Sequence, residues 1–234
     1  MYTKQFKMDI HDIDYRGISK VSALMRLMQS AAESQLSEVG LSYDNLKRDS
    51  KAFILSRITL KIYKDTTIED ELVASTYPTH SRGFTFMRCF GIEKDGEPVC
   101  AATSAWALID TESRSLIRVD NFDLPLDIHP AIDCLLGRFI LPKDMDEVGR
   151  YTVGYGDIDR NRHMNNTVYP DAYLTFLPLA KKRISELTIS YRSEAVMGDV
   201  LSVFMKEIDG VYYFKTVKSD GTVNTEAEIR LSDS

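Results

Sequence analysis

The sequence predicts an α+β protein in which a helix packed on an antiparallel sheet occurs twice in tandem. Three features indicate this fold: one long amphipathic helix near the N-terminus, several segments of period-two alternation, and a second half that repeats the order of elements. With 234 residues, 44% of them hydrophobic and 27% charged, the chain is long and apolar enough to bury a core. We therefore expect one large or two small folded domains and not a disordered chain.

The long helix is expected between Ser19 and Gly40. Apolar side chains recur there at intervals of three and four residues, the pattern of a helix with one face on a core. They are Val21, Leu24, Met25, Met28, Ala31, Ala32 and Val39. Ser19 suits the N-cap, and Gly40 suits the left-handed residue that ends many helices.

Strands are expected where apolar and polar residues alternate. In the first half the segments are 58–63, 84–92 and 99–109, the last around the single tryptophan, Trp106. In the second half they are 151–155, 187–191, 200–208 and 211–217. Asp-Gly pairs at 95–96, 209–210 and 220–221 are strong signals for two-residue hairpin turns, so we expect the strands to be antiparallel.

The second half repeats the first closely enough to indicate an internal duplication. A helix-like run is expected from Thr167 to about Ala180, and Asp157-Ile158-Asp159 precedes it as Asp12-Ile13-Asp14 precedes the first helix, 145 residues earlier. A helix on a curved antiparallel sheet, repeated in tandem, describes an α+β double hotdog.

Three segments divide the chain. Residues 1–120 form the first unit, which we expect to shape a pocket for an apolar chain, and 149–234 form the second, expected to carry the chemistry. Residues 121–148, with Pro125, Pro130 and Pro142, are expected to form a connector, with a short helix at 132–139.

Composition excludes several functions. A net charge of −6 argues against general nucleic-acid binding, which needs a clustered basic surface. No apolar run has the length of a secretory signal or a membrane span, so we expect a cytoplasmic protein without a membrane span. The three cysteines, Cys89, Cys100 and Cys134, lack disulfide or zinc-site spacing, so we expect small buried side chains and no metal.

The polar loop 156–166 carries the candidate chemistry. It packs two carboxylates, three amides and an imidazole into eleven residues with almost nothing apolar, which a core does not require. A calcium loop fails because Arg162 stands where the sharp turn needs glycine and Val168 where the last ligand should be glutamate. Helix capping by Asn165 or Asn166, with an Asx-turn at Asp157, remains an alternative for those residues.

Within this loop Asp159, Asn161, His163, Asn165 and Asn166 follow the spacing Asp-x-Asn-x-His-x-Asn-Asn. This pattern resembles that of the acyl-acyl carrier protein (acyl-ACP) thioesterases of plants and bacteria. The resemblance covers most of the chain and extends to the strand 187–194, which ends in Tyr-Arg-Ser-Glu, to residues 104–106 and to the downstream Arg114 and Arg118. The resemblance implies a double hotdog that hydrolyses acyl-ACP thioesters to free fatty acid without metal or organic cofactor, with acyl carrier protein as the partner.

The resemblance also implies roles for individual residues. Glu194 or His163 takes the proton of the attacking water, Asn161 positions the water or the carbonyl, and Asp159 orients them. Plant members carry a cysteine where this chain has Ala195, so a cysteine nucleophile is not evident and hydrolysis by activated water is expected. Backbone N–H groups at the start of the second helix, just after Asn165 and Asn166, are expected to stabilise the oxyanion.

The corresponding loop of the first half, 12–18, lacks the asparagine and the histidine and should be chemically silent. Met25, Met28 and Ala32 on the first helix are candidates to line the acyl pocket, and ordinary core packing explains them equally well. Basic residues that could dock an acidic carrier, or that are simply solvated, are Arg160, Arg162, Lys181, Lys182 and Arg183.

Other functions fit the same fold. An acyl-coenzyme A thioesterase would share the chemistry, a dehydratase would act on a hydroxyacyl group, and an acyl-binding module would retain lipid without turnover. A double hotdog already contains the paired units that single hotdogs obtain by dimerising, so both a monomer and a homodimer are compatible with the sequence.

Overall fold

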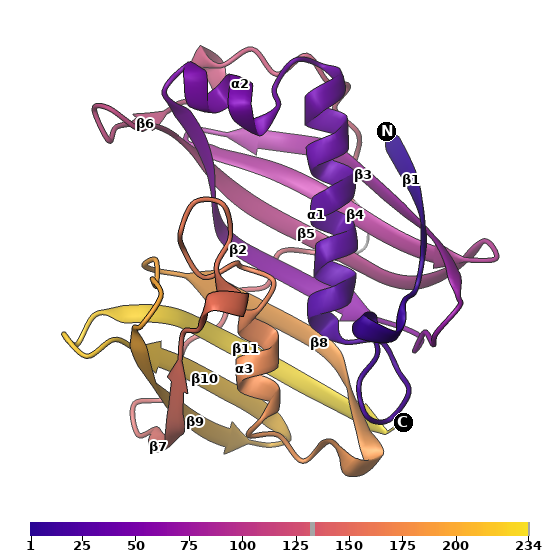
Figure 1. Cartoon of the computed structure of the whole chain (residues 1–234), viewed down its shortest axis with the longest axis vertical. Coiled ribbons are helices and arrows are strands. Elements are labelled where there is room, and N and C mark those ends of the chain that lie inside the picture. Colours follow the sequence, from indigo (N-terminus) through magenta and orange to yellow (C-terminus); the bar gives the residue numbers. More distant parts are fainter. Residues whose placement is uncertain (132–133, 234) are drawn as a thin grey trace. The chain divides into compact units, whose positions relative to one another are not determined.

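The computed structural model describes residues 1–131 and 134–233. The chain divides into two compact units, Met1–Leu136 and Gly137–Ser234. Each unit contains an antiparallel sheet and a helix (Figure 1). The α+β class expected from the alternation and from the amphipathic helix is confirmed.

The sheet of the first unit has the strand order β1-β3-β4-β5-β2, with β6 beside β5, and every pairing is antiparallel. The strands are β1 (Tyr2–Lys7), β2 (Lys51–Ile62), β3 (Glu71–Arg82), β4 (Thr85–Lys94), β5 (Glu97–Asp110) and β6 (Leu116–Ile117). The segments expected at 58–63, 84–92 and 99–109 fall within β2, β4 and β5 to within a residue or two. The alternation did not reveal β1 and β3.

Helix α1 (Val21–Glu38) packs on β3, β1 and β4. Its N-cap is Lys20, which makes no side-chain capping bond, so the expected Ser19 cap is wrong. Ser19 instead pairs with Ile13 as an isolated β-bridge, which places it in the preceding hairpin. Gly40 has φ +78°, the left-handed conformation expected after the helix. A short helix, α2 (Tyr43–Arg48), follows it.

Two of the three Asp-Gly pairs form the expected turns. Asp95 and Gly96, between β4 and β5, have φ of 52° and 78°, both positive as a type I′ turn requires. Asp209-Gly210 repeats that geometry, with φ of 51° and 77°. At 220–221 only the glycine has a positive φ, so the pair does not form this turn. The Asp220 carboxylate instead accepts a hydrogen bond from the N–H of Thr222 at 2.8 Å.

The sheet of the second unit has the order β8-β11-β10-β9-β7, again antiparallel. Its strands are β7 (Asp146–Thr152), β8 (Lys182–Tyr191), β9 (Val200–Ile208), β10 (Val211–Val217) and β11 (Val223–Asp233). The segments expected at 200–208 and 211–217 match β9 and β10. The strand expected at 151–155 lies earlier, as β7, and β11 was not anticipated.

The helix of the second unit, α3 (Tyr169–Leu174), is much shorter than the expected run from Thr167 to Ala180. Pro178 explains the early end, because it has no N–H for a helical bond and its ring would clash with the carbonyl of Leu174, four residues back. A 3-10 turn, η4 (Leu179–Lys181), leads from there into β8.

The short helix expected at 132–139 is not found in residues 134–139, which have no regular structure, and residues 132–133 lie outside the described residues. The three cysteines are buried free thiols, as expected. Among the described residues, no helix is long and apolar enough to cross a membrane.

Candidate active site

A tight turn shapes the polar loop of the second unit. The N–H of Asp159 donates to the carbonyl of His163 at 2.9 Å, and the N–H of Arg162 donates to the carbonyl of Asp159 at 3.0 Å. Ile158 and Met164 pair on either side of the turn as an isolated β-bridge. Backbone bonds therefore hold the side chains of this loop in a defined arrangement.

Arg162 adopts the left-handed conformation at this turn, with φ +67°. A turn of this kind usually places glycine there, because any side chain clashes with the backbone, at a cost of about 1–3 kcal/mol. Neither the spacing motif nor the charge of Arg162 predicted this conformation.

The Asp159 carboxylate organises the turn. One oxygen accepts the backbone N–H of Asn161 at 2.7 Å and that of His163 at 3.4 Å, and the other accepts the Asn161 side-chain amide at 3.3 Å. Asp159 thus orients the Asn161 amide directly, and it acts on His163 through the backbone. The second N–H and the carbonyl of the exposed Asn161 amide have no partner among the described residues.

His163 and Glu194 meet. Nε2 of His163 lies 3.1 Å from Oε2 of Glu194, and their side chains are 34% and 57% exposed. The backbone aligns the two segments, because His163 pairs with Val196 as an isolated bridge and the N–H of Met164 donates to the carbonyl of Ala195 at 2.8 Å. Two groups able to move protons therefore stand together at a surface that solvent and substrate can reach.

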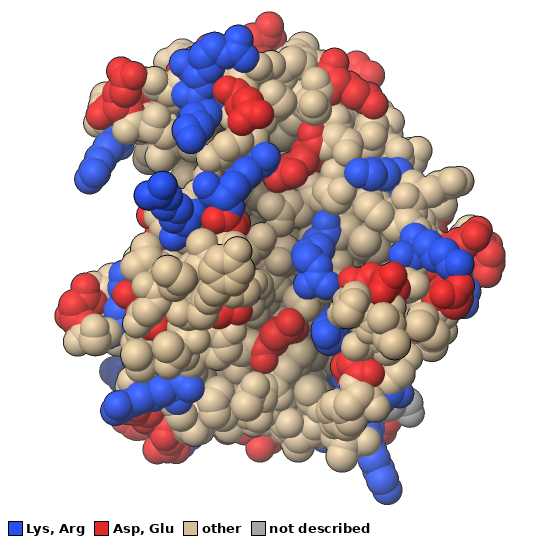
Figure 2. Space-filling model, in the orientation of Figure 1, with Lys and Arg blue, Asp and Glu red and all other residues tan. Residues whose placement is uncertain are grey.

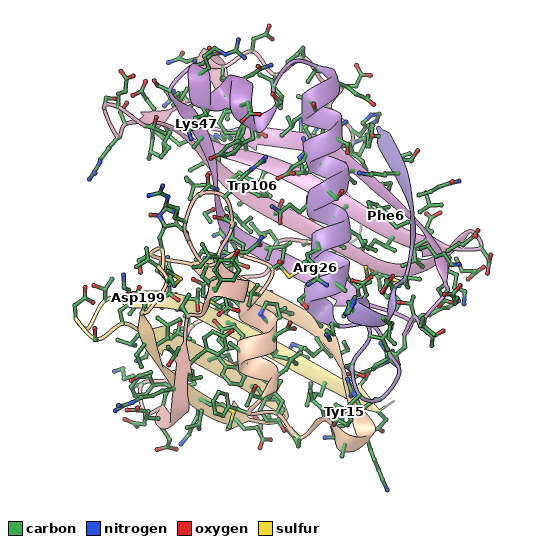
Figure 3. All side chains as sticks on the ribbon, in the orientation of Figure 1. Phe6, Tyr15, Arg26, Lys47, Trp106 and Asp199 are labelled. Atoms are coloured by element: carbon green, nitrogen blue, oxygen red, sulfur yellow. The ribbon has the colours of Figure 1, made fainter. Side chains whose placement is uncertain are left out.

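An ion pair supports the segment that bears Glu194. Lys218 Nζ donates to the Glu194 carbonyl at 3.2 Å and lies 3.2 Å from Oδ2 of Asp199. The same Asp199 oxygen accepts the N–H of Val196 at 3.0 Å; Asp199 is labelled in Figure 3. Sequence reasoning missed both residues, because nothing in their spacing marks two charges on different elements as partners.

Asn224 holds the end of β8 just before Glu194. Its side-chain amide donates to the carbonyl of Ser193 at 2.5 Å and to the Tyr169 hydroxyl at 3.2 Å. Its backbone carbonyl accepts the N–H groups of Arg192 and Ser193. This fully buried asparagine was also missed; a polar residue at an inward position of a strand was the available signal.

The helix capping considered for Asn165 is not found, because the N-cap of α3 is Val168. Asn165 instead builds an Asx-turn. Its side-chain oxygen accepts both the N–H and the hydroxyl of Thr167, each at 3.0 Å, and its carbonyl accepts the N–H of Val168 at 2.9 Å. The N–H groups just after Asn166, which the sequence suggested as oxyanion donors, are therefore used within the turn.

Asn166 presents free donors. Its carbonyl accepts the hydroxyl of Tyr191 at 2.8 Å, and burial raises the pKa of Tyr191 well above its ordinary value, so this hydroxyl stays protonated and donates. The backbone N–H and the side-chain amide of Asn166 have no partner within the described part of the chain. Tyr169 packs edge-on against the Tyr191 ring, with 5.5 Å between centroids.

The pocket-lining and carrier-docking candidates are the remaining predicted site residues. Met25, Met28 and Ala32 are buried on α1, at 3%, 2% and 8% exposure, a placement that fits core packing and pocket lining alike. Of the basic candidates, Arg183 is half-buried and the other four, Arg160, Arg162, Lys181 and Lys182, are exposed. Figure 2 shows basic and acidic side chains interspersed on the face drawn. Within residues 1–131 and 134–233, no cluster of three or more His, Cys, Asp or Glu could hold a metal ion.

The fold defines the class of protein as a double hotdog. Two solved structures resemble nearly the whole chain. An acyl-ACP thioesterase from Bacteroides thetaiotaomicron has a TM-score of 0.91 and 22% identity, and the match covers 98% of this chain and 97% of that one. The 12:0-ACP thioesterase from Umbellularia californica has a TM-score of 0.82 and 18% identity, and the match covers 100% of this chain and 97% of that one. At these identities the likeness concerns the fold, and it confirms the architecture expected from the sequence.

The sequence identifies the family. The profile of the acyl-ACP thioesterase N-terminal domain matches residues 1–122, and that of the C-terminal domain matches residues 141–233. The chain therefore belongs to the acyl-ACP thioesterase family, which confirms the resemblance seen in the polar loop.

Curated relatives agree with this family. They include the chloroplastic oleoyl-acyl carrier protein thioesterase 2 of Arabidopsis thaliana, 22% identical over 86% of this chain and 61% of the relative. The chloroplastic dodecanoyl-[acyl-carrier-protein] hydrolase of Cinnamomum camphora is 24% identical over 86% of this chain and 58% of its own length. The chain spans less than two thirds of the length of these two relatives.

Proposed function

We propose that this protein hydrolyses acyl-ACP thioesters by activated water and releases free fatty acid. The contact of 3.1 Å between His163 Nε2 and Glu194 Oε2, beside the ordered amide of Asn161, is the observation that carries the proposal. Membership of the acyl-ACP thioesterase family supports the reaction and the carrier.

The proton transfers follow from the pair. Water attacks the thioester carbonyl carbon while the base, Glu194 or the imidazole of His163, takes one of its protons. The tetrahedral intermediate then expels the carrier's sulfur, which receives that proton, so that one water and one thioester yield one acid and one thiol. Either residue serves as base with the other as its hydrogen-bonded partner, and a base of this kind contributes about 10² to 10⁴ in rate.

Amides at the loop are the proposed donors to the oxyanion. The second N–H of the Asn161 amide and the free N–H groups of Asn166 lack partners among the residues described. Donors already fixed by the surrounding structure need no reorganisation as charge develops, and one such donor is typically worth about 10² to 10³ in turnover. Asp159 fixes the Asn161 amide, which is its proposed role in catalysis.

In this proposal the remaining predicted site residues bind the acyl chain and the carrier protein of the substrate. The first unit accommodates the acyl chain, with Met25, Met28 and Ala32 as proposed lining residues on α1. Arg160, Arg162, Lys181, Lys182 and Arg183 are the proposed contacts for the acidic surface of acyl carrier protein. Since their charges are largely at the surface, salt should weaken carrier binding.

Assays with the same acyl chain on acyl carrier protein and on coenzyme A test the proposal. Free acid and free thiol should appear in equal amounts, faster from the carrier protein, and His163→Ala should lose this activity while its thermal unfolding stays as in the wild type. Faster hydrolysis of the coenzyme A thioester would make it an acyl-CoA thioesterase. An enoyl product from a hydroxyacyl thioester would indicate a dehydratase, and retained lipid without turnover an acyl-binding module.

A further inference from the structure

Arg88 is a buried cation in the first unit. It lies on β4, on the face shared by Phe86, Phe90 and Ile92, and is 7% exposed. Burial lowers its pKa to about 10, so it keeps its charge at neutral pH. In the part of the chain that the structure describes, it forms no ion pair with a carboxylate. An unpaired buried charge is costly, and this one therefore calls for an explanation.

The partners of Arg88 use only one edge of its guanidinium. Nη1 donates to Oε1 of Gln35 on α1 at 2.6 Å and to Oγ1 of Thr76 on β3 at 3.0 Å. Thr76 in turn donates to the carbonyl of Cys89 at 3.0 Å. These bonds tie the helix to the sheet, and they leave the other nitrogen atoms of Arg88 unused.

The unused groups of this cluster are all donors. Arginine carries five N–H groups, and those on Nε and Nη2 of Arg88 meet no acceptor in residues 1–131 and 134–233. Because Arg88 can only donate, Gln35 must turn its oxygen toward it, which leaves the Gln35 NH₂ group without an acceptor among the same residues. Gln35 is itself only 6% exposed.

The free edge of Arg88 has the shape of a carboxylate site. Nε–H and Nη2–H form a planar fork that matches the two oxygens of a carboxylate. Arg88 itself stands opposite Pro78 and Ser104, and apolar rings lie further along the same face of the sheet: Phe86 stands opposite Trp106, labelled in Figure 3, and its ring lies 5.4 Å from that of Phe53. A small hydrated anion would lose its water there, whereas an acid with an aliphatic chain suits both the fork and its surroundings.

We propose that Arg88, assisted by Gln35, binds the carboxylate of an aliphatic acid inside the first unit. Two sources share this chemistry: the free fatty acid released by the enzyme, and the far carboxylate of a substrate derived from a dicarboxylic acid. The carboxylate follows from Arg88 itself, and its identification with product or substrate rests on the proposed function.

Titration calorimetry of the full chain with decanoate and with decanol tests the site. The wild type should bind decanoate more tightly than decanol, and Arg88→Met should lose about 10- to 100-fold in affinity for decanoate, the usual value of a charged hydrogen-bonded contact, with decanol unchanged. Equal affinities for acid and alcohol, no binding of the acid, or unchanged decanoate affinity in a folded Arg88→Met would each overturn the proposal.

A second variant tests the site in case Arg88→Met does not fold. Gln35→Met removes the amide donor, together with the oxygen that accepts from Nη1 of Arg88, and should weaken decanoate binding by about 3- to 10-fold, as expected for the loss of one neutral hydrogen bond to the ligand. If Arg88→Met does not fold, judged by circular dichroism and thermal unfolding, this variant and the comparison of acid with alcohol decide the question. Unchanged decanoate affinity in Gln35→Met would remove that residue from the site.

Kinetics distinguish the two sources. If the product is the ligand, decanoate inhibits the wild type and Arg88→Met relieves the inhibition. If a substrate carboxylate is the ligand, the coenzyme A monothioester of decanedioic acid has a lower KM than decanoyl-CoA, and Arg88→Met abolishes the difference. Carboxylate binding through Arg88 without hydrolysis of any thioester would contradict the proposed function and leave this inference standing. Hydrolysis without such binding would contradict this inference and leave the proposed function standing.

Discussion

The polar loops of the two units share one backbone. Residues 9–20 and 154–165 each run through a 3-10 turn into a tight hairpin. An aspartate N–H donates to the carbonyl four residues on, at 2.8 Å from Asp14 and 2.9 Å from Asp159. In both loops the N–H of the residue three positions after this aspartate donates to the aspartate carbonyl at 3.0 Å. The duplication read from three matching residues is thus reproduced bond for bond.

The side chains on this shared backbone differ where the chemistry is proposed. Ile18 occupies the position of His163, and Arg16 that of Asn161. Arg16 pairs with the carboxylate of Asp14, with 2.7 Å between Nη2 and Oδ2, so that this loop closes on itself. The aspartate and the turn therefore supply a scaffold, and two side chains distinguish the loop that is expected to be chemically silent from the proposed catalytic one.

The sharpest test of this comparison removes the proton-moving groups. Glu194→Gln and His163→Gln should each lower turnover of acyl-ACP by about 10² to 10⁴ with thermal unfolding unchanged, because one variant loses the base and the other its hydrogen-bonded partner, while the size of the side chain is nearly kept. Ile18→Ala in the first loop and Glu147→Gln, an exposed acid on β7 of the second unit, should leave turnover unchanged. Turnover near the wild-type level in both Gln variants would refute the assignment of the site.

The two scaffold aspartates provide a second test. Asp159→Ala and Asp14→Ala each remove an acceptor of several N–H groups and should lower the free energy of unfolding by about 1–2 kcal/mol. Only Asp159→Ala should also lower turnover, since it frees the Asn161 amide. Chemical denaturation and steady-state kinetics measure the two effects. Equal losses of turnover in both variants would mean that activity simply follows stability.

The smallest effect concerns the left-handed position of the turn. Arg162→Gly should raise the free energy of unfolding by about 0.5–1 kcal/mol, because relief of strain exceeds the added flexibility of the unfolded chain. Gly17→Ala, at the matching position with φ +84°, should lower it by about 1 kcal/mol. A higher KM of Arg162→Gly for acyl-ACP, with no change in KM for acyl-CoA, would support a role of Arg162 in carrier docking. A lower free energy of unfolding of Arg162→Gly would contradict the claim that Arg162 is strained.

Local patterns predicted local structure well. Strands β9 and β10, their turn and most of α1 follow from alternation, Asp-Gly chemistry and helical periodicity, all of which lie within a few residues of each other. Strand β11 was missed because its inward positions include Thr225 and Ala227, which give little apolar contrast. The second helix was overestimated because the apolar run continues past the point where Pro178 ends it.

The sequence by itself determined the family and the duplicated loop, and it indicated His163, Asn161 and Asp159 as candidate site residues, because the spacing of these residues is a property of a short stretch of chain. Only the tertiary structure decided that Glu194 meets His163 at 3.1 Å, that Asn165 caps a turn and that Arg88 keeps unused donors. Those contacts join segments far apart in the chain or depend on backbone geometry, and register and packing set them rather than residue spacing.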